Sequence, residues 1–588
     1  MNTLTLADTS RSDYKTERAR VGETHPSNFV SQLGYDALKG INVAFINMPL
    51  RETAKPNTPP QGPGLMASRL RQYGADVSII DLNAYRIRDE VAARRNLSLG
   101  RHLTREEASG LMSRHFAKHG APDVIALSGM ITTLRWQEFS ASAARALVPD
   151  AFIISGGGLA TEIREGLLSW IPELDAVVHS EGDDVMLLIA HDVKQASDRG
   201  FRNNIVMLDD RPYRSRAGSR GLLYHGDRPQ SLDKLPFAAW DLLHKDVDGN
   251  TLLEWYIHTP VWGGDANNSS ATSFTMKRSL TTVSSRGCPH ACKFCFRGAQ
   301  GERDYGMRST DNLRKEAEWL LKSYNIDFLG FPDDNFAVNT NRMKELPSTL
   351  RGLNLRWGTH TRLDEADMQR LVPMRESGCV YIGFGAESAS AHVLELMGKG
   401  GHILRPKGAK ENQLVSVGDF QFPLTMMEGI GNCRSLGIHG NCTWIMGYPG
   451  ETLRDLKTSV AFVQWQIAEA TRGKTPGTPD HQNAFDSINR KMFVATAYPG
   501  TEMCRNERVQ DLLKAHFGVS FQTVSCKTEP VVDEHLRNYV LELDDATKVM
   551  HGTDGEPIYY GAMAMDQFLE ARSYVDGGVP EKILDMKE

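Results

Sequence analysis

The sequence lacks several features that would place it in a class of protein at once. No apolar run among its 588 residues approaches the ~18 residues of a membrane span, so no membrane partner is expected. The N-terminal stretch contains no apolar core typical of a secretory signal. A net charge of -6 gives no electrostatic reason to expect nucleic acid as a partner. We therefore expect a cytoplasmic protein.

Cysteine is scarce as well, with 8 residues in the whole chain. In the cytoplasm thiols stay reduced, so a group of cysteines indicates metal binding or catalysis more than disulfides. Three of them, Cys288, Cys292 and Cys295, nevertheless fall within the stretch "CPHACKFC". The other five are scattered without the spacing of a second cluster, so one metal centre is predicted.

The first half of the chain alternates short apolar runs with helix-like segments. Each run is β-branched and nearly continuous, as expected of strands buried on both faces of a parallel sheet. We predict strands at 41–48, 76–82, 124–129, 151–158 and 176–182. This pattern is typical of a doubly wound, Rossmann-like α/β domain over 41–200, whose ligands bind at the carboxyl ends of the strands. Residues 1–40 are predicted to form an N-terminal arm, and 201–279 a connector that contains a hairpin.

A second alternating region follows at 280–505. Its predicted strands are 280–285, 326–331, 355–360, 379–385, 441–447 and 491–497, with an amphipathic helix at 311–324. Six strand–helix steps fall short of the eight of a full barrel, so a partial (β/α)6 barrel is expected. Residues 506–588 are predicted to form a small α/β region that caps the barrel or contacts the substrate.

The spacing of the three cysteines agrees with two kinds of metal site. A structural zinc ion needs a fourth ligand, which His290 or a distant cysteine could supply. An iron–sulfur cluster held by three thiolates leaves one iron open to an external ligand. Spacing alone does not separate the two. A structural zinc ion is usually bound by two pairs of ligands from two segments of the chain, and the sequence contains no second closely spaced pair. The position of three cysteines on one loop therefore favours the iron–sulfur cluster.

The cysteine stretch resembles the CxxxCxxC signature of radical S-adenosylmethionine (SAM) enzymes. "GFPDDNFAVN" (330–339), "GTHTRLD" (358–364), "IGFGAESAS" (382–390), "MGYPGET" (446–452) and "ATAYPGTE" (495–502) resemble the strand-end motifs of that family in the same order. The resemblance implies that Cys288, Cys292 and Cys295 bind a [4Fe–4S] cluster whose fourth iron is chelated by SAM. The SAM contacts that it implies are Phe294, Asp333, Asp334, Arg362, Glu387 and Ser388. For the carboxylates, the alternative is a solvated residue at the end of a strand.

Glycines follow two strands of the first domain, in "ISGGGLAT" (154–161) and "HSEGDD" (179–184). They let a large ligand approach the backbone, or they serve only tight turns. The GxGxxG dinucleotide fingerprint is absent. A doubly wound domain ahead of a CxxxCxxC barrel resembles the cobalamin-binding subclass of radical SAM enzymes. The resemblance implies cobalamin contacts at Ser128, Gly129, Met130, Gly156, Gly157, Gly158, Glu181 and Gly182. The DxHxxG motif that supplies a histidine to cobalt is absent.

The resemblance implies a methyltransferase that passes a methyl group from SAM, through methylcobalamin, to an unactivated carbon or phosphorus of a small molecule or peptide. It places the reaction in the biosynthesis of a natural product or cofactor, with a flavodoxin- or ferredoxin-like electron donor. A non-methylating reaction of the same subclass (cyclisation, ring contraction or oxygen insertion) is the alternative. A cofactor-binding sensor, and a first domain that binds no cobalamin, also remain open.

Overall fold

The structure is a computed structural model that describes residues 25–49, 58–94, 96–97, 103–218, 221–258, 276–296, 305–524, 527–543 and 548–588. The chain divides into two compact units. The first unit consists of the chain up to Pro49 together with Pro60–Asn83 and Leu103–Thr251. The second unit consists chiefly of Leu252–Glu588. Most of the predicted N-terminal arm lies outside the described residues. Its described end contains the short helix α2 (Pro26–Val30), which packs against α9 (Val185–Asp198).

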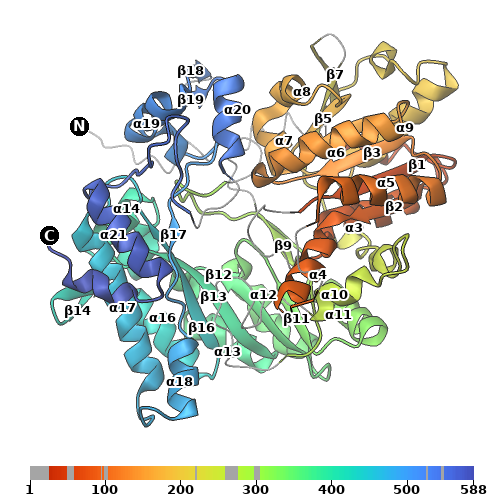
Figure 1. Ribbon diagram of the computed structural model, residues 1–588. Coiled ribbons are helices and arrows are strands. Elements are labelled where there is room, and N and C mark those ends of the chain that lie inside the picture. The colour runs from red at the N-terminus through yellow and green to blue at the C-terminus, as the bar shows by residue number, and fades with distance from the viewer. Residues whose placement is uncertain are drawn as a thin grey trace, which may run out of the picture. The chain divides into compact units, whose positions relative to one another are not determined.

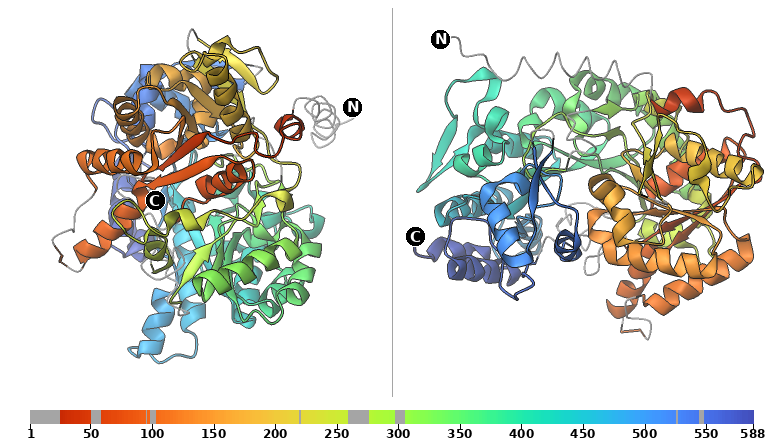
Figure 2. Two further views of the ribbon diagram at one scale, coloured as in Figure 1. Left: turned by 90° about the vertical axis from the view of Figure 1, so that its right-hand side faces the viewer. Right: turned by 90° about the horizontal axis from the view of Figure 1, so that it is seen from above.

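The first unit contains the predicted parallel sheet. Its strands are β1 (Asn42–Asn47), β2 (Asp76–Asp81), β3 (Val124–Ser128), β4 (Phe152–Gly156) and β5 (Ala176–His179). All five predicted strands are confirmed, and neighbours pair in parallel in the order β2-β1-β3-β4-β5. β1, β3 and β4 are buried along almost their whole length because helices cover both faces of the sheet (Figures 1 and 2).

Two helical layers enclose this sheet. They comprise α3 (Gln61–Arg71), α5 (Arg105–His119), α6 (Leu134–Leu147), α7 (Gly158–Ile163), α8 (Leu167–Trp170) and α9. α3 packs against α9, and α5 packs against α6. α4 (Leu82–Arg94) begins directly after β2, but from Ala84 onward it belongs to the second unit. The doubly wound architecture expected from the sequence is therefore confirmed.

Residues predicted as a connector add two strands to the first sheet. β6 (Arg214–Ala217) and β7 (Gly221–His225) form an antiparallel hairpin, and β7 pairs in parallel with β5. The predicted hairpin is thus present, and it extends the sheet rather than linking two domains. A long stretch of the same region, 259–275, lies outside the described residues, and α10 (Leu252–His258) precedes it.

The second unit is built on a curled sheet of six parallel strands. They are β8 (Ser279–Thr281), β11 (Phe328–Phe331), β12 (Arg356–Thr361), β13 (Cys379–Glu387), β16 (His439–Met446) and β17 (Phe493–Val494), and they lie side by side in chain order. This order confirms the predicted partial barrel. The short strands β9 (Ser285–Arg286) and β10 (Gly306–Met307) pair separately beside it.

Helices cover the outer face of this half-barrel (Figure 1). They include α11 (Thr310–Tyr324), which matches the predicted helix, α12 (Thr340–Thr349), α13 (Met368–Glu376), α16 (Leu424–Ser435) and α17 (Leu453–Thr471). Trp357 and Phe384 point outward, toward the helices. Trp357 Nε1 donates to the carbonyl of Ser377 at the end of α13, and a Cβ on Gly440 would touch both Phe384 and Cys433 of α16. By the alternation of side chains along a strand, their neighbours in sequence face the interior.

Smaller elements complete the second unit. α14 (Ala391–Leu396), α15 (Gly400–Leu404) and the hairpin of β14 (Leu414–Val417) and β15 (Phe420–Pro423) lie between β13 and α16, and α18 (Pro479–Asp486) follows α17. The C-terminal region contains α19 (Glu507–Phe517), β18 (Phe521–Val524), β19 (Lys527–Pro530), α20 (Glu534–Leu541), α21 (Met565–Asp576) and the 3-10 helix η11 (Pro580–Asp585). η11 packs on both α17 and α21.

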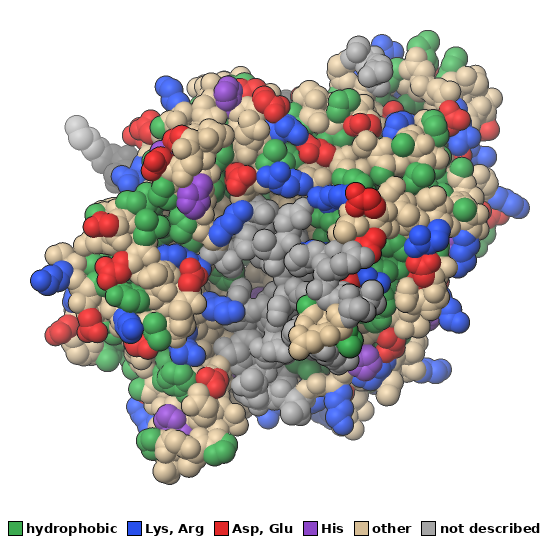
Figure 3. Space-filling view, in the orientation of Figure 1, with side chains coloured by type: hydrophobic (Ala, Val, Ile, Leu, Met, Phe, Trp, Pro, Cys, Tyr) green, Lys and Arg blue, Asp and Glu red, His purple; other side chains and the backbone are tan. Residues whose placement is uncertain are grey.

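The described surface carries mixed charges. On the face shown in Figure 3, Lys and Arg side chains are interspersed with Asp and Glu rather than gathered into a patch of one sign. No helix among the described residues is long and apolar enough to cross a membrane.

Candidate functional site

The three cysteines of the CxxxCxxC stretch lie on the loop that follows β8 and β9. Cys292 is buried, Cys288 is half-buried and Cys295 is exposed. The backbone of this loop is fixed at both ends. The N–H of Gly287 donates to the carboxylate of Asp334 at 3.2 Å, and the N–H of Lys293 donates to the carbonyl of Met397 at 2.9 Å. The loop therefore presents its thiols at the carboxyl ends of the half-barrel strands.

A buried polar network supports the first cysteine. The side-chain amide of Asn335 lies 4.0 Å from Cys288 Sγ and donates to Glu365 at 3.1 Å. The Thr361 hydroxyl lies 2.6 Å from the amide oxygen of Asn335 and 2.8 Å from the carboxylate of Glu365, and can donate its one proton to either; His290 Nε2 lies 3.2 Å from Glu365. Sequence reasoning did not select Thr361 or Glu365, because a single carboxylate after a strand gives no sign of which neighbour it will meet.

Positive charge surrounds the second cysteine. Arg362 Nη1 lies 3.4 Å from Cys292 Sγ, and the same guanidinium forms two hydrogen bonds with Asp364, at 2.8 and 3.1 Å. A hydrogen bond from the thiol of Cys295, together with the charges of Lys399 and Arg362, lowers the pKa of Cys292 to about 5 despite its burial. The loop thus stabilises a thiolate, which is the form that binds metal.

The end of β13 carries a buried ion pair. Lys399 Nζ lies 3.3 Å from Glu387 Oε1, and both side chains are largely shielded from solvent. Burial raises the pKa of Glu387, while Lys399 opposes that shift. Glu387 has a φ of 65°, and a Cβ on Gly385 would lie 2.4 Å from its carboxylate, so the pair depends on a glycine there. Lys399 Nζ also lies 5.8 Å from the ring centroid of Phe294.

Besides Arg362 and Glu387, two further predicted SAM contacts, Asp333 and Ser388, are engaged within the protein. Asp333 is buried and accepts hydrogen bonds from the N–H of Ser284 (2.8 Å) and the hydroxyl of Ser285 (2.5 Å), which fixes the entry to the cysteine loop. Burial raises its pKa. Ser388 bonds to Ser459 of α17 at 3.1 Å. Phe294, Arg362 and Glu387 lie beside the cysteines, and Asp334 is exposed. Direct contact with SAM stays a prediction for all six.

The donor set fits an iron–sulfur cluster. Among the described residues, no three His, Cys, Asp or Glu side chains converge as the ligands of a single ion would. A cluster instead binds its three thiolates at separate corners and leaves the fourth iron open. The cations Arg362 and Lys399 would offset the negative charge of the thiolates. His290, the candidate fourth zinc ligand, is already paired with Glu365.

The predicted cobalamin contacts lie at the carboxyl edge of the first sheet. Gly129 and Gly156 follow β3 and β4, and the N–H of Gly129 donates to the carbonyl of Gly156 at 3.1 Å. Gly157 has a φ of +96°, and a Cβ there would lie 2.3 Å from the oxygen of Gly129. A Cβ on Gly129 would likewise meet the side chains of Gln137 and Thr133, so glycine at 129 and 157 is required by the turns themselves, whereas a Cβ on Gly156 would meet only Val178, at 3.7 Å. Glycine at this edge agrees with the predicted cofactor site, and the site stays a prediction.

The other predicted cobalamin contacts surround this glycine edge. Ser128 ends β3, Gly158 begins α7, and the side chain of Met130 is 48% exposed. Glu181 is paired with Arg228 at 2.7 Å, and a Cβ on Gly182 would lie 2.8 Å from Met66 Sδ. Their contacts with a cofactor stay predictions.

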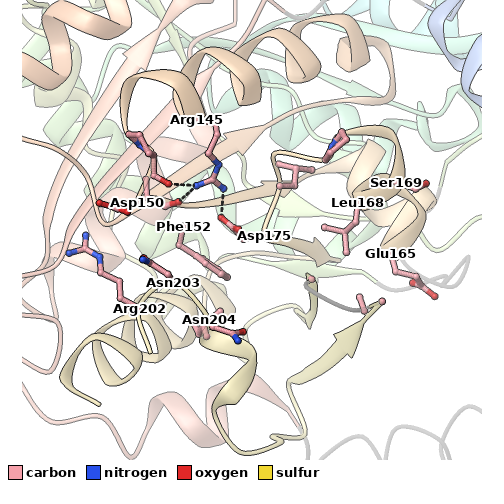
Figure 4. A pocket seen from close by; sticks show the side chains of 18 residues that line it. Arg145, Asp150, Phe152, Glu165, Leu168, Ser169, Asp175, Arg202, Asn203 and Asn204 are labelled. Carbon is pink, nitrogen blue, oxygen red and sulfur yellow. Dashed lines mark hydrogen bonds and ion pairs between the residues drawn. The ribbon is translucent and has the colours of Figure 1, made fainter. Parts of the chain in front are cut away.

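A separate cavity of about 820 Å³ lies at the opposite edge of the first sheet, near the amino ends of β4 and β5 (Figure 4). Arg145 donates to the carbonyls of Pro149, Ala151 and Glu173 and to the carboxylate of Asp175. Its guanidinium is therefore committed to the protein itself. The cavity lies away from the carboxyl edge where ligands of such sheets bind.

Comparisons with known proteins identify the second unit. Residues 282–463 match the family model of the Radical SAM superfamily. An uncharacterized methyltransferase of Pyrococcus horikoshii is 22% identical over 467 residues, covering 77% of this chain and 80% of its own length. The anaerobic magnesium-protoporphyrin IX monomethyl ester cyclase of Rubrivivax gelatinosus is 26% identical over 312 residues, covering 51% of this chain and 50% of its own length.

Solved structures match across both units. The cobalamin-dependent SAM radical enzyme OxsB, with aqua-cobalamin and SAM bound, aligns with a TM-score of 0.55 at 15% identity, covering 83% of this chain and 63% of its own. The radical SAM methyltransferase TsrM of Kitasatospora setae, with tryptophan and a SAM analogue bound, also gives 0.55 at 15% identity, covering 92% and 88%. The radical SAM domain expected from the motifs is confirmed over residues 282–463, and the chain shares the fold of these two solved structures.

Proposed function

We propose that the protein is a methyltransferase that uses a [4Fe–4S] cluster, SAM and cobalamin to methylate an unactivated carbon or phosphorus of a small molecule or peptide. One observation carries the proposal: a single chain combines three thiols on one loop of a half-barrel with glycines at the carboxyl ends of the strands of a doubly wound sheet. When bound, the three cofactors supply the electron, the radical and the methyl group.

The residues of the chain hold and orient these groups. Cys288, Cys292 and Cys295 bind the cluster, and Arg362 and Lys399 stabilise its thiolates by charge. Buried cations are effective there because the surroundings are poor in water and screen little. A flavodoxin- or ferredoxin-like protein supplies the electron, as the reduction of SAM requires an external reductant.

The glycine edge binds the corrinoid. Gly156, where a Cβ would meet only Val178 at 3.7 Å, would lie beside it. No DxHxxG motif follows β1, so a corrinoid bound here would take no histidine from that position.

A second candidate function is a cyclisation of the radical type without methyl transfer. It is favoured by the similarity to the magnesium-protoporphyrin IX monomethyl ester cyclase over half of this chain. The two functions differ in their products. Methylation by a radical route yields 5′-deoxyadenosine and S-adenosylhomocysteine in equal amounts, a polar methyl transfer yields only the latter, and cyclisation only the former.

The decisive experiment is purification without oxygen, followed by measurement of iron, bound corrinoid and the products of SAM. In Cys295→Ala we expect loss of the ~400 nm cluster absorption and of SAM cleavage, with corrinoid still bound. Cys379→Ala is the matched control, because Cys379 is buried at the start of β13, outside the loop. Zinc in place of iron, or unaltered SAM after chemical reduction, would refute the proposal.

A further inference from the structure

A buried arginine behind the cysteine loop has no part in the cofactor contacts described so far. Arg342 lies in the first turn of α12, where its backbone N–H donates to the side chain of the N-cap residue Asn339 at 3.0 Å. Arg342 is only 3% exposed, and its Cζ lies 4.9 Å from the centroid of the Phe336 ring. The start of the helix and this aromatic ring therefore fix the direction of the guanidinium.

The guanidinium uses little of its capacity for hydrogen bonds. Its Nη2 donates to the carbonyl of Ser284 at 3.2 Å, whereas Nε and Nη1 have no hydrogen-bond partner in the part of the chain that the structure describes. Tyr305 is near enough for the charge of Arg342 to oppose the rise that burial causes in the pKa of Tyr305. Burying an incompletely paired cation is unfavourable for folding, so the position of Arg342 points to a role for its charge.

The charge of Arg342 acts on the buried carboxylate of Asp333. Asp333 follows β11 and accepts hydrogen bonds from the N–H of Ser284 at 2.8 Å and from the hydroxyls of Ser284 and Ser285. Burial raises the pKa of Asp333, and the charge of Arg342 is the main influence that opposes the rise. The hydrogen bonds also favour the ionised carboxylate, which accepts them without a proton of its own.

Arg342 and Asp333 hold the same residue from two sides. Asp333 binds the N–H and the hydroxyl of Ser284, and Arg342 binds its carbonyl, which also accepts the N–H of Arg308 at 3.0 Å. Ser284 is fully buried and lies four residues before Cys288. A residue that follows β11 and the first turn of α12 thus together fix the backbone just ahead of the cysteine loop.

We propose that Arg342 is a positioning residue for the cysteine loop, because its bond to Ser284 and its charge beside Asp333 fix the backbone that places Cys288 for the cluster. The inference rests on the proposed function and adds a residue that acts without touching a thiol. Arg362, by contrast, reaches the sulfur of Cys292 directly. If Arg342 acts through Asp333, removing both charges together is milder than removing that of Arg342 alone.

The first test measures iron per chain after anaerobic reconstitution and gel filtration. We expect at least fivefold less iron in Arg342→Met than in the wild type. The double variant Arg342→Met/Asp333→Asn should recover to within twofold of the wild type, because neither charge remains and the amide oxygen still accepts the N–H of Ser284. Arg342→Lys, which keeps the charge, should retain at least threefold more iron than Arg342→Met.

Two further variants are the controls for this test. Arg351→Met, at an exposed position after α12, should retain iron as the wild type does. Tyr305→Phe, which alters the other group near the guanidinium, should stay within twofold of the wild type. A double variant no better than Arg342→Met overturns the proposal, as does a loss of iron in Tyr305→Phe equal to that in Arg342→Met.

The second test needs no cluster. Hydrogen–deuterium exchange of the complete, metal-free chain is read by mass spectrometry of its peptides. Peptides that span 282–287 should exchange at least fivefold faster in Arg342→Met than in the wild type, while those of β3 in the first sheet stay unchanged. Unchanged exchange at 282–287 overturns the proposal, and so does an equal rise along the whole chain, which would mean a role in overall stability alone.

The two tests separate this inference from the proposed function. Wild-type protein that binds no iron–sulfur cluster refutes the proposed function, and with it any role of Arg342 in cluster binding. A cluster that Arg342→Met retains in full refutes only the role of Arg342.

Discussion

At the scale of single residues, Arg362 shows how a side chain acts on the cysteine loop through both charge and shape. Its planar guanidinium bonds to Asp364 at two points and still reaches Cys292 at 3.4 Å. Lysine has the same charge but only one terminal nitrogen, so it cannot maintain the contacts with both Asp364 and Cys292. The geometry of the guanidinium, rather than its charge alone, therefore supports the thiolate.

We expect Arg362→Lys to fold but to retain iron poorly. Losing the bidentate pair and the contact with sulfur should cost ~1–3 kcal/mol of local stabilisation. After anaerobic reconstitution and gel filtration, the iron content per chain should fall several-fold. Arg356→Lys is the control, since Arg356 begins β12, the strand that Arg362 follows, and pairs with Asp327 at a more exposed site. Unchanged iron in Arg362→Lys would contradict this role.

Glu451 is a buried carboxylic acid without a cation beside it. Its Oε2 accepts a hydrogen bond from the N–H of Gly447 at 2.5 Å, whereas its Oε1 has no partner among the described residues. Burial raises the pKa of Glu451 from 4.5 to about 8. The folded protein therefore holds a proton there that the unfolded chain releases at lower pH.

This difference makes stability fall as pH rises. Below pH 4.5 both states are protonated and no penalty arises; between pH 4.5 and 8 only the unfolded state ionises, and stability falls by up to ~1.4 kcal/mol per pH unit. Glu451→Gln keeps the bond to Gly447 and removes the proton. We expect its thermal midpoint to depend less on pH across this window than that of the wild type.

The matched control for this prediction is Glu428→Gln, on the exposed side of α16. It should leave the pH dependence of the thermal midpoint as it is in the wild type. A Glu451→Gln profile parallel to the wild-type profile would show that Glu451 is ionised in the folded protein.

At the scale of elements, one buried carboxylate ties a helix to the added hairpin of the first sheet. Asp192 of α9 accepts hydrogen bonds from Arg214 (2.5 Å), Tyr224 (3.0 Å) and Tyr213 (3.2 Å), all from the hairpin or its approach. Both charged side chains are almost fully buried. The hairpin is therefore joined to the unit by polar bonds as well as by the pairing of β7 with β5.

We expect Asp192→Ala to destabilise the first unit by ~3–5 kcal/mol, because it leaves the guanidinium of Arg214 buried without a partner. Limited proteolysis should then cut first near the hairpin, and the thermal midpoint should fall. Asp198→Ala is the control, at the last residue of the same helix and exposed. Equal protease sensitivity of the two variants would contradict the role of Asp192.

At the scale of the whole molecule, the residues proposed to bind the cluster and those proposed to bind the corrinoid belong to different units. Gly157 can accept no side chain without displacing Gly129, and its φ of +96° is strained for any other residue. We expect Gly157→Val to reduce bound corrinoid at least tenfold while iron content stays within the range of the wild type. Corrinoid is measured by its visible absorption after release. Gly249→Val is the control, since it also has positive φ but open space around it.

Loss of iron together with corrinoid in Gly157→Val would mean that the two sites are not built separately. Reciprocal results, with Cys295→Ala losing iron alone and Gly157→Val losing corrinoid alone, would establish two independently formed sites within one chain.

How much of the fold can be predicted from the sequence depends on how far apart along the chain the interacting residues lie. All eleven predicted strands, five in the first sheet and six in the half-barrel, are present because each needs only a short apolar run and a following turn. The contribution of β6 and β7 to the first sheet was not predicted. Their place in this sheet depends on the pairing of β7 with β5, which no local sequence pattern indicates.

The sequence by itself determined the two alternating regions, the three-cysteine loop and the glycine-rich strand ends, because spacing along the chain expresses all of these. Only the tertiary structure decided that Asp333 and Ser388 bond within the protein and that Glu365 and Lys399 join the cysteine loop. The physical reason is that a side chain's partner is set by which strand ends meet, and that meeting is a property of the folded sheet rather than of neighbours in sequence.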